Sequence, residues 1–316
     1  MLKVARKIMT VIIVAGSAVL LASSSFGAMT VEEVIDNMGR AYEKRMKGIQ
    51  DFTIVRENVA GMGAFAGETV IYQKRAEVGG KTIYKTRTEI KMMGRSVVTI
   101  YDGEYDWSVD PMSGNVEKEE AQRDPVQIWR NLDLTQTHYL GEEEIEGKKT
   151  HVLKIDDPFK VLGRQQAPRP AMQPDHQQTP PAGERSGRPQ VLPPREQEDV
   201  GEIEAEGQLW ISDKTWMPVR TLITTRSKSV EEGKEIITTW KTTTDYRDFR
   251  RLGPLLTPCR IVVNTTVDVP SLGEEERRQT GMMRQFMGGM GSFEVEVTEV
   301  KVNTGLSDDL FDGTKL

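Results

Sequence analysis

The chain has few of the residues on which most enzymes and metal proteins depend. Its 316 residues include one cysteine, Cys259, and three scattered histidines, His138, His151 and His176. One thiol cannot form an internal disulfide, and no histidine pair has metal-ligand spacing. No G-x-S-x-G motif or other catalytic constellation is present. The sequence therefore predicts a binding protein with no catalytic residue, metal or cofactor.

Long apolar runs are also missing, except at the N-terminus. Residues 8–22 form an apolar run after a basic start, and small residues follow it up to Gly27. The run is short for a membrane span, and the pattern is typical of a secretory signal peptide. We expect residues 1–27 to be removed and the protein to be exported. An uncleaved N-terminal anchor is the alternative.

Positive charge is scarce, which argues against nucleic acid as a partner. The chain has 42 Lys and Arg residues against 48 Asp and Glu residues, a formal net charge of -6. Loss of the signal peptide would remove Lys3, Arg6 and Lys7 but no acidic residue, which lowers the charge to -9. Nucleic-acid affinity depends on neutralising phosphates with Lys and Arg, so an acidic protein is poorly suited to it.

The mature sequence begins with one helix and continues mainly as strands. Thr30 and Glu33 form a capping box before an apolar stripe of helical spacing that ends near Met46. From Asp51 onward the apolar period changes to two, with turn signals between segments, and a short helix is expected from Asp124-Pro125 to Leu132. About eleven strands joined by short turns predict a long antiparallel sheet, curled enough to have a hollow side.

Local signals refine this sheet at two places. Asp102-Gly103 in TIYDGEYDWSVDP, residues 99–111, predicts a tight hairpin in which Trp107 alternates with polar residues. The apolar phase slips in the last strand near Thr298 or Glu299, which predicts a β-bulge. The tryptophans fit either ordinary sheet packing or a hollow side that faces a ligand.

Residues 163–201 interrupt the strand pattern. Eight of the chain's 15 prolines lie here among Gln, Arg and Gly, with almost no aliphatic side chains. Such a segment cannot bury enough apolar area to offset the entropy of ordering it. We expect a disordered Pro/Gln-rich insert within a single domain of residues 28–316, because the strand pattern resumes unchanged. A division into two domains is the alternative.

A second helical signal precedes the last strand. Ser271 and Glu274 have the spacing of a capping box. The apolar residues that follow are Met282, Met283, Phe286 and Met287. Methionine adapts to varied apolar shapes, so this segment fits a movable cover over a ligand as well as a core helix.

Several motifs together resemble one family. The helix near the start is followed by YDGEYDWSVDP, YLGEEEIEGKKTHVLKI, GQLWISDKTWMPVRTLI and LSDDLFDGTKL. In this order they are similar to the LolA-like family of periplasmic outer-membrane lipoprotein-sorting proteins, over most of residues 30–160 and 203–316. The resemblance implies a mainly β fold, an unclosed antiparallel β-barrel with helices on its concave apolar side. It also implies that lipid or lipoprotein acyl chains bind there.

The resemblance also suggests a latch for the helical lid. In the carriers, a Lys-Arg-Pro stretch after an early strand holds an arginine that helps to latch the lid. Lys74-Arg75 stands at the matching place, and Ala76 replaces the proline. Arg75 is therefore the expected latch residue.

The sequence leads to a hypothesis of a periplasmic carrier. It would shield lipoprotein acyl chains or phospholipid on the way to the outer membrane, and could exchange them with an inner-membrane transporter or an outer-membrane acceptor. Met62, Phe65 and Trp107 are expected to contact the ligand together with the methionine-rich segment. One alternative is a regulatory module that senses lipid or mislocalised lipoprotein and signals to a membrane partner. Another is an envelope structural protein with a filled core.

Overall fold

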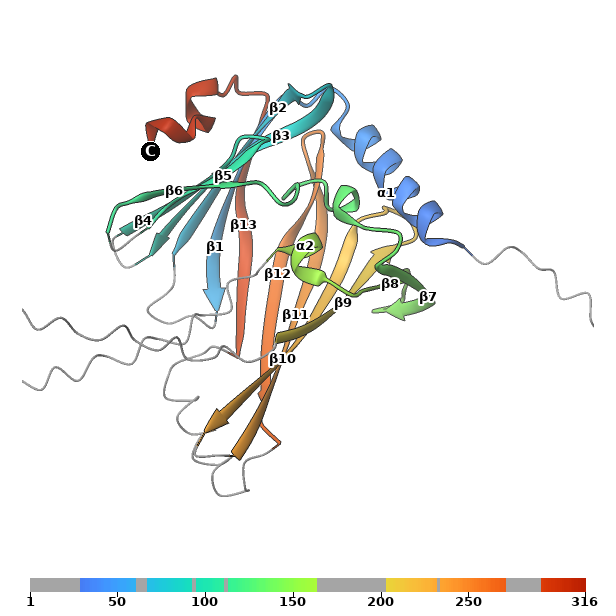
Figure 1. Ribbon diagram of the computed structural model, residues 1–316. Helices are drawn as coiled ribbons and strands as arrows, with labels where there is room; N and C mark the ends of the chain where they lie inside the picture. The colour runs from blue at the N-terminus through green and yellow to red at the C-terminus, as the bar shows by residue number, and fades with distance from the viewer. Residues whose placement is uncertain are drawn as a thin grey trace, which may run out of the picture.

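A single antiparallel sheet dominates the computed structural model, which describes residues 29–60, 67–92, 95–110, 113–163, 203–231, 234–270 and 291–316 (Figure 1). The described strands number thirteen, in the order β6-β5-β4-β3-β2-β1-β13-β12-β11-β10-β9-β8-β7. Their bounds are β1 Asp51–Ala60, β2 Glu68–Val78, β3 Lys81–Met92, β4 Arg95–Tyr101, β5 Tyr105–Val109, β6 Val116–Glu120, β7 Thr137–Ile145, β8 Lys148–Ile155, β9 Ile203–Ser212, β10 Pro218–Glu231, β11 Lys234–Leu252, β12 Leu255–Asp268 and β13 Ser292–Val302.

The order of the strands divides the sheet into two meanders. Strands β1 to β6 form the first and β7 to β13 the second, and they meet where β1 pairs with β13. Strands β6 and β7 remain at the two edges, so the sheet is unclosed, as expected. β8 pairs directly with β9, so the strands on either side of the proline-rich segment are neighbours in one sheet.

The strand count exceeds the expected eleven, and β6 shows why. Its sequence, Val-Glu-Lys-Glu-Glu, has no apolar alternation, and all five residues are exposed. Only its pairing with β5 makes it a strand. An edge strand that buries none of its side chains has no period-two pattern of apolar residues, so the sequence does not predict it.

The helices are few and short, apart from the first. They are α1 Val31–Met46, α2 Pro158–Leu162, and the 3-10 helices η2 Ile128–Asn131, η3 Asp308–Phe311 and η4 Gly313–Lys315. The predicted capping box is present, since the Thr30 side chain accepts from the Glu33 backbone and the Glu33 side chain accepts from that of Thr30. No helix in the described part of the chain has both the length and the apolar character needed to cross a membrane.

The helix expected from Asp124 to Leu132 is wrong for most of its length. Asp124 Oδ1 accepts hydrogen bonds from the backbone nitrogens of Val126 (2.9 Å) and Gln127 (2.8 Å). These are the hydrogen bonds of a helix N-cap, so the start signal is present. Gln127, at φ -99° and ψ 63°, leaves the helical conformation, so no α-helix continues from it. Only η2 follows it.

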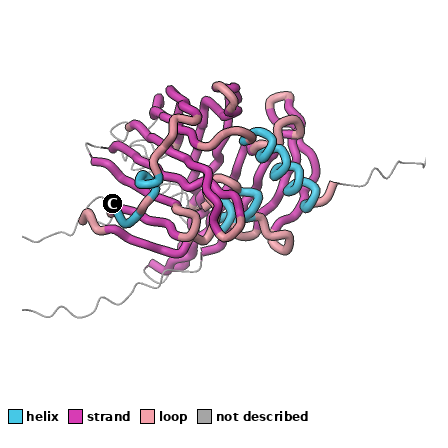
Figure 2. The backbone as a smooth tube through the Cα atoms, turned by 90° about the horizontal axis from the view of Figure 1, so that it is seen from above, coloured by secondary structure: helices cyan, strands magenta, loops and turns pink. Residues whose placement is uncertain are grey.

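Helix α1 lies on one face of the sheet and requires that face to be concave. Val34 and Met38 pack in a cluster with residues of β8 and β9, and Met46 packs in another with residues of β1 and β3. From Val34 to Met46 the helix rises roughly 18 Å. On a flat sheet β8 and β1 would lie about 29 Å apart. The strands therefore curve around the helix, as the view from above shows (Figure 2).

The bulge predicted in the last strand is confirmed. On β13, Glu299 pairs with Val55 and Val297 pairs with Arg56, so Thr298 is the extra residue. The shift returns Val297 to the face that Val300 occupies, and both pack against the cluster around Phe52.

A buried polar clamp joins the two meanders at one end. Asp51 is 4% exposed, and its Oδ1 accepts from the backbone nitrogen (2.8 Å) and hydroxyl (3.1 Å) of Thr304, while its Oδ2 accepts from the backbone of Gly305 (3.0 Å). Asn303, at φ 55°, donates to the Gly48 carbonyl (2.9 Å) and accepts from the backbone of Gln50 (2.7 Å). The beginning of β1 and the end of β13 are thereby fixed together.

We expect Asp51→Ala to lower the free energy of unfolding by about 3 kcal/mol, because it leaves buried donors unpaired. Urea denaturation followed by circular dichroism measures the change. Asp309→Ala is the control, since it removes an exposed carboxylate bound to Lys315 and should cost less than about 1 kcal/mol. If the two substitutions lowered the free energy of unfolding equally, the Asp51 contacts would not be a stabilising clamp.

Residues 1–28, 164–202 and 271–290 lie outside the described residues. The expected signal peptide, the proline-rich insert and the methionine-rich helix fall within these ranges and remain predictions.

Candidate functional site

The central strands have one apolar face and one charged face. We call the face on which α1 lies the inner face. Its apolar residues on β10 to β13 are Ile223, Trp240, Cys259, Ile261, Val263, Val267, Phe293, Val295 and Val297. Strict alternation along each strand places them together, because successive side chains point to opposite faces.

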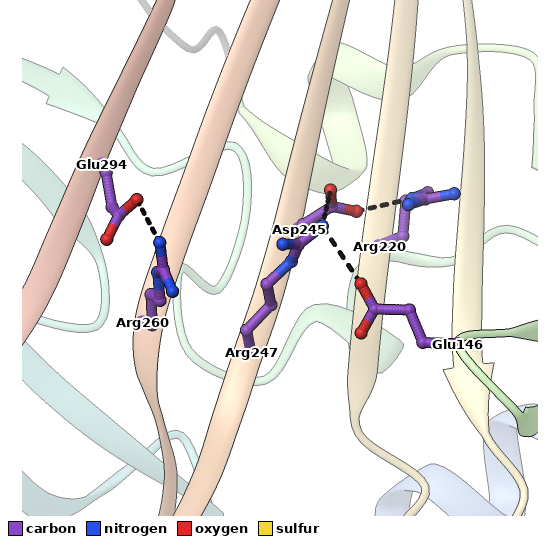
Figure 3. Close-up of polar contacts among 6 residues, drawn as sticks. All are labelled: Glu146, Arg220, Asp245, Arg247, Arg260 and Glu294. Atoms are coloured by element: carbon purple, nitrogen blue, oxygen red, sulfur yellow. Dashed lines mark hydrogen bonds and ion pairs between the residues drawn. The ribbon is translucent and has the colours of Figure 1, made fainter. Parts of the chain in front are cut away.

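The outer face carries a network of ion pairs across the same strands (Figure 3). The pairs are Arg260 with Glu294 (2.6 Å), Arg220 with Asp245 (2.5 Å), and Arg247 with Asp245 (3.2 Å) and Glu146 (3.1 Å). Each arginine in this network therefore forms an ion pair with a carboxylate. The charged outer face can be exposed to water, whereas the apolar inner face is more stable when other groups shield it from water.

Helices cover only part of the inner face in the described structure. Helix α1, η2 and α2 pack in clusters with residues of β1, β3, β8 and β9. On the central strands Ile223, Cys259 and Val263 are buried. Ile261 and Val295, beside them, are partly exposed. Partly exposed apolar side chains thus continue from the helix-covered core along β12 and β13.

Clefts elsewhere are polar. One, of about 220 Å³, lies beside the ion-pair network and is lined by Glu146, Asp245 and Arg247, among other residues. Another, of about 270 Å³, is lined by Arg130, Asp133 and other mostly polar residues. Neither lining suits an acyl chain, which needs apolar contacts. The inner face is therefore the candidate binding surface.

Arg56 is a cationic side chain on the inner face. Arg56 on β1 is in phase with Phe52 and Ile54 and pairs with Val297 on β13. The side chain is partly exposed, while its Nε is sealed from solvent and makes no hydrogen bond. Burial lowers the pKa of the Arg56 guanidinium.

Tyr246 on β11 lies near Arg56 on the same face. It pairs with Ile261, which in turn pairs with Val295, so the three side chains form a row across β11, β12 and β13. Burial raises the pKa of the Tyr246 hydroxyl, and the charge of Arg56 and a hydrogen bond with Thr221 oppose this. Arg56 and Tyr246 are therefore polar groups among the apolar side chains of the inner face.

The predicted ligand residues are placed as follows. Met62, Phe65, Met282, Met283, Phe286 and Met287 lie outside the described residues. The described residues nearest to them meet at one end of the sheet, where Ala60 pairs with Glu294 and the Gly291 carbonyl accepts from the Thr265 backbone (2.6 Å). The segments that carry the predicted cover thus join the sheet at the uncovered end of the inner face.

Trp107 packs against the protein itself. It pairs with Ile100 on β4, and its Nε1 donates to Asp102 Oδ2 at 2.8 Å. A Cβ added at Gly313 would overlap the Trp107 ring, so the C-terminal segment lies directly on it. The register places this contact on the outer face. Contact of Trp107 with a ligand stays a prediction.

Arg75 lies on the inner face opposite Tyr84, near the end of α1. Its Nη2 is 3.9 Å from Glu77 Oε1, and its charge lowers the pKa of Tyr84, against a larger rise from burial. The lid that it was expected to latch is outside the described residues. The latch stays a prediction.

His151 lies on the inner face at the β8 end of the sheet and is 3% exposed. Its ring stacks on Trp216 at 4.9 Å, and Nδ1 is 3.2 Å from the Tyr139 hydroxyl. Burial lowers its pKa from the ordinary 6.5. The stacked, buried ring is a packing residue in its neutral form. Within the described residues, no three His, Cys, Asp or Glu side chains are grouped to hold a metal.

Acid should therefore destabilise the protein partly through His151. The unfolded chain takes up the proton near pH 6.5 while folded His151 stays neutral, so stability is lost as the pH falls from 6.5 through the folded pKa. We expect His151→Gln to reduce the slope of unfolding free energy against pH in this window. The control His138→Gln removes an exposed histidine. An unchanged slope in His151→Gln would show that the ring titrates normally.

Comparison with known proteins gives likenesses of structure only. No protein-family model and no curated protein matches the chain. A DUF1329 family protein from Desulfovibrio piger is 14% identical, with 91% of this chain and 99% of that chain covered and a TM-score of 0.47. A putative outer membrane lipoprotein-sorting protein domain from Vibrio parahaemolyticus is 11% identical, with 90% and 98% covered and a TM-score of 0.46.

A LolA superfamily protein from Nitrosomonas europaea is 13% identical, with 92% of this chain and 100% of that chain covered and a TM-score of 0.46. The last two names agree with the LolA-like family that the sequence motifs resemble. Identities and TM-scores this low say nothing about ligands, so any assignment of function has to come from the chain's own residues.

Proposed function

We propose that the protein is a periplasmic carrier that shields the acyl chains of lipids or lipoproteins on its inner face. One observation carries the proposal. The apolar face of β12 and β13 continues beyond the part that α1, η2 and α2 cover in the described structure, with Ile261 and Val295 partly exposed. Soluble proteins rarely leave a contiguous apolar face uncovered unless it binds something.

The magnitude of the hydrophobic effect suits this role. Each buried methylene contributes about 0.8 kcal/mol, so a sixteen-carbon chain contributes roughly 12 kcal/mol at most. The entropy cost of binding reduces this figure substantially. An unclosed sheet, whose edges β6 and β7 do not pair, leaves a path for such a chain to enter and leave.

The export signal and the LolA-like motifs of the sequence support the periplasmic location. The proposed partners are an inner-membrane transporter that hands over the lipid or lipoprotein, or an outer-membrane acceptor that receives it.

Two neighbouring residues of β12 provide a matched test of the binding face. Ile261 is on the inner face, and Val262 is on the outer face, paired with Asp245 and Glu294. We expect Ile261→Gln to weaken binding of a palmitoylated neutral peptide by about tenfold, because it puts an amide among apolar contacts. Val262→Gln should change it by less than about twofold. Displacement of a fluorescent acyl probe measures both.

A second experiment tests the function in its native setting. The protein purified from its own cells is extracted with organic solvent, and the extract is analysed for lipid by mass spectrometry. Empty protein that also fails to bind the palmitoylated peptide would refute the carrier.

A further inference from the structure

The inner face holds a positive charge that the carrier role described so far does not use. Three arginines on the outer face each have a carboxylate within 3.2 Å. Arg56 is different, since no carboxylate among the described residues forms an ion pair with it, and Tyr246 is the described titratable group whose charge acts on it. A carrier of purely neutral acyl chains has no need of a cation there.

A buried charge without a partner is costly. Transfer of an isolated ammonium or guanidinium group from water into an apolar environment is strongly unfavourable unless a counter-charge and hydrogen bonds compensate. An apolar side chain of similar volume would fill the same place between Ile54 and Val297 at lower cost. A cation at such a position is therefore a candidate for a functional group, as unpaired charges in binding sites often are.

The surroundings of Arg56 suit an amphipathic ligand. Arg56 is partly exposed as a residue, although its Nε is sealed from solvent and makes no hydrogen bond. Tyr246 lies on the same face, interacts with Arg56 electrostatically, and has its hydroxyl hydrogen-bonded with Thr221. Apolar side chains continue from this pair along β12 and β13, through Ile261 and Val263 to Phe293 at the uncovered end. The polar end of a ligand would meet Arg56 and Tyr246, and its tail would follow the apolar row.

We propose that Arg56 and Tyr246 bind the anionic head of the lipid, a carboxylate or a phosphate, whose acyl chain lies on the inner face. The proposal rests on the carrier function and names its ligand class, an anionic single-chain or phosphate-headed lipid. A guanidinium forms paired hydrogen bonds with the oxygens of either head, and a tyrosine hydroxyl can donate one more. An acyl chain linked to a neutral peptide would make the apolar contacts only.

The test compares ligands of equal chain length with different heads. Hexadecanoic acid and hexadecyl phosphate should displace the fluorescent acyl probe about tenfold to a hundredfold more strongly than hexadecanol, as charge-assisted hydrogen bonds predict. Acetate and inorganic phosphate alone should not displace it, because the head without a tail lacks the apolar contacts. Displacement by the free anions would instead identify a site for small anions and overturn the lipid assignment.

A matched pair of variants tests the residue itself. Arg56→Met removes the charge and keeps much of the volume, and it should bring the acid and the phosphate down to the affinity of the alcohol. Arg226→Met is the control, since Arg226 is exposed on the outer face, 3.8 Å from Glu204, and all three affinities should be unchanged. Folded Arg56→Met that still prefers the acid over the alcohol would overturn the proposal.

A third measurement does not depend on the folding of Arg56→Met. Carbon-13 spectra of carboxyl-labelled hexadecanoic acid bound to the wild-type protein should show a carboxyl pKa below that of the free acid, because the guanidinium favours the anion. Tyr246→Phe should reduce acid binding by less than Arg56→Met does. A carboxyl pKa at or above the free value would place the head away from Arg56.

The outcomes separate this inference from the carrier function. Binding of the alcohol and the palmitoylated peptide without any preference for the anions would overturn the inference and leave the carrier intact. Failure of every acyl ligand to bind would overturn both.

Discussion

The pairing of β1 with β13 is the constraint on which the rest of the structure depends. It joins two meanders that are each built from hairpins between consecutive strands, and its partners lie some 240 residues apart in the sequence. Asp51 and Asn303 fix its end, and the bulge at Thr298 sets the phase of β13 so that its valines face inward on both sides of the irregularity. Without this junction the two apolar faces could not form one concave surface.

That surface is the one proposed to bind a ligand. A sheet that is apolar on one face has to bury that face, and in the described structure a single long helix and a few short turns cover the end formed by residues of β1, β3, β8 and β9 and by Leu255 of β12. On β12 and β13 the inward residues remain mainly apolar beyond the part that the helices cover, while β10 and β11 place several threonines there. The same alternation therefore stabilises the core at one end and leaves partly exposed apolar side chains at the other.

Much of the architecture could be predicted from the sequence because its signals are local. The capping box of Thr30 and Glu33, the period-two strands and the phase slip at Thr298 depend on neighbours within a few residues, and each is present in the structure. The failures also have physical causes. β6 has no apolar alternation. Asp124 caps the backbone of Val126 and Gln127 as expected, but Gln127 leaves the helical conformation.

The candidate site was harder to predict than the fold. The hairpin around Trp107 was a strong local signal, but the sequence could not show that the C-terminal segment lies on that ring. Arg56 is in phase with Phe52 and Ile54, but the sequence analysis did not single it out, because one charge in a strand is not a signal for a site. Its significance needed Tyr246, which is brought near it from a strand three places away in the sheet.

The exposed edge strand β6 has a consequence for the solution behaviour of the molecule. Strand β6 carries three carboxylates among its five residues, those of Glu117, Glu119 and Glu120. The Lys118 ammonium lies 3.6 Å from the centre of the Tyr105 ring and is held there by that contact. Like charges repel when two copies of such an edge approach, which blocks the strand addition that leads to fibres. The charge of β6 therefore works against edge-to-edge pairing of two copies at this side of the sheet.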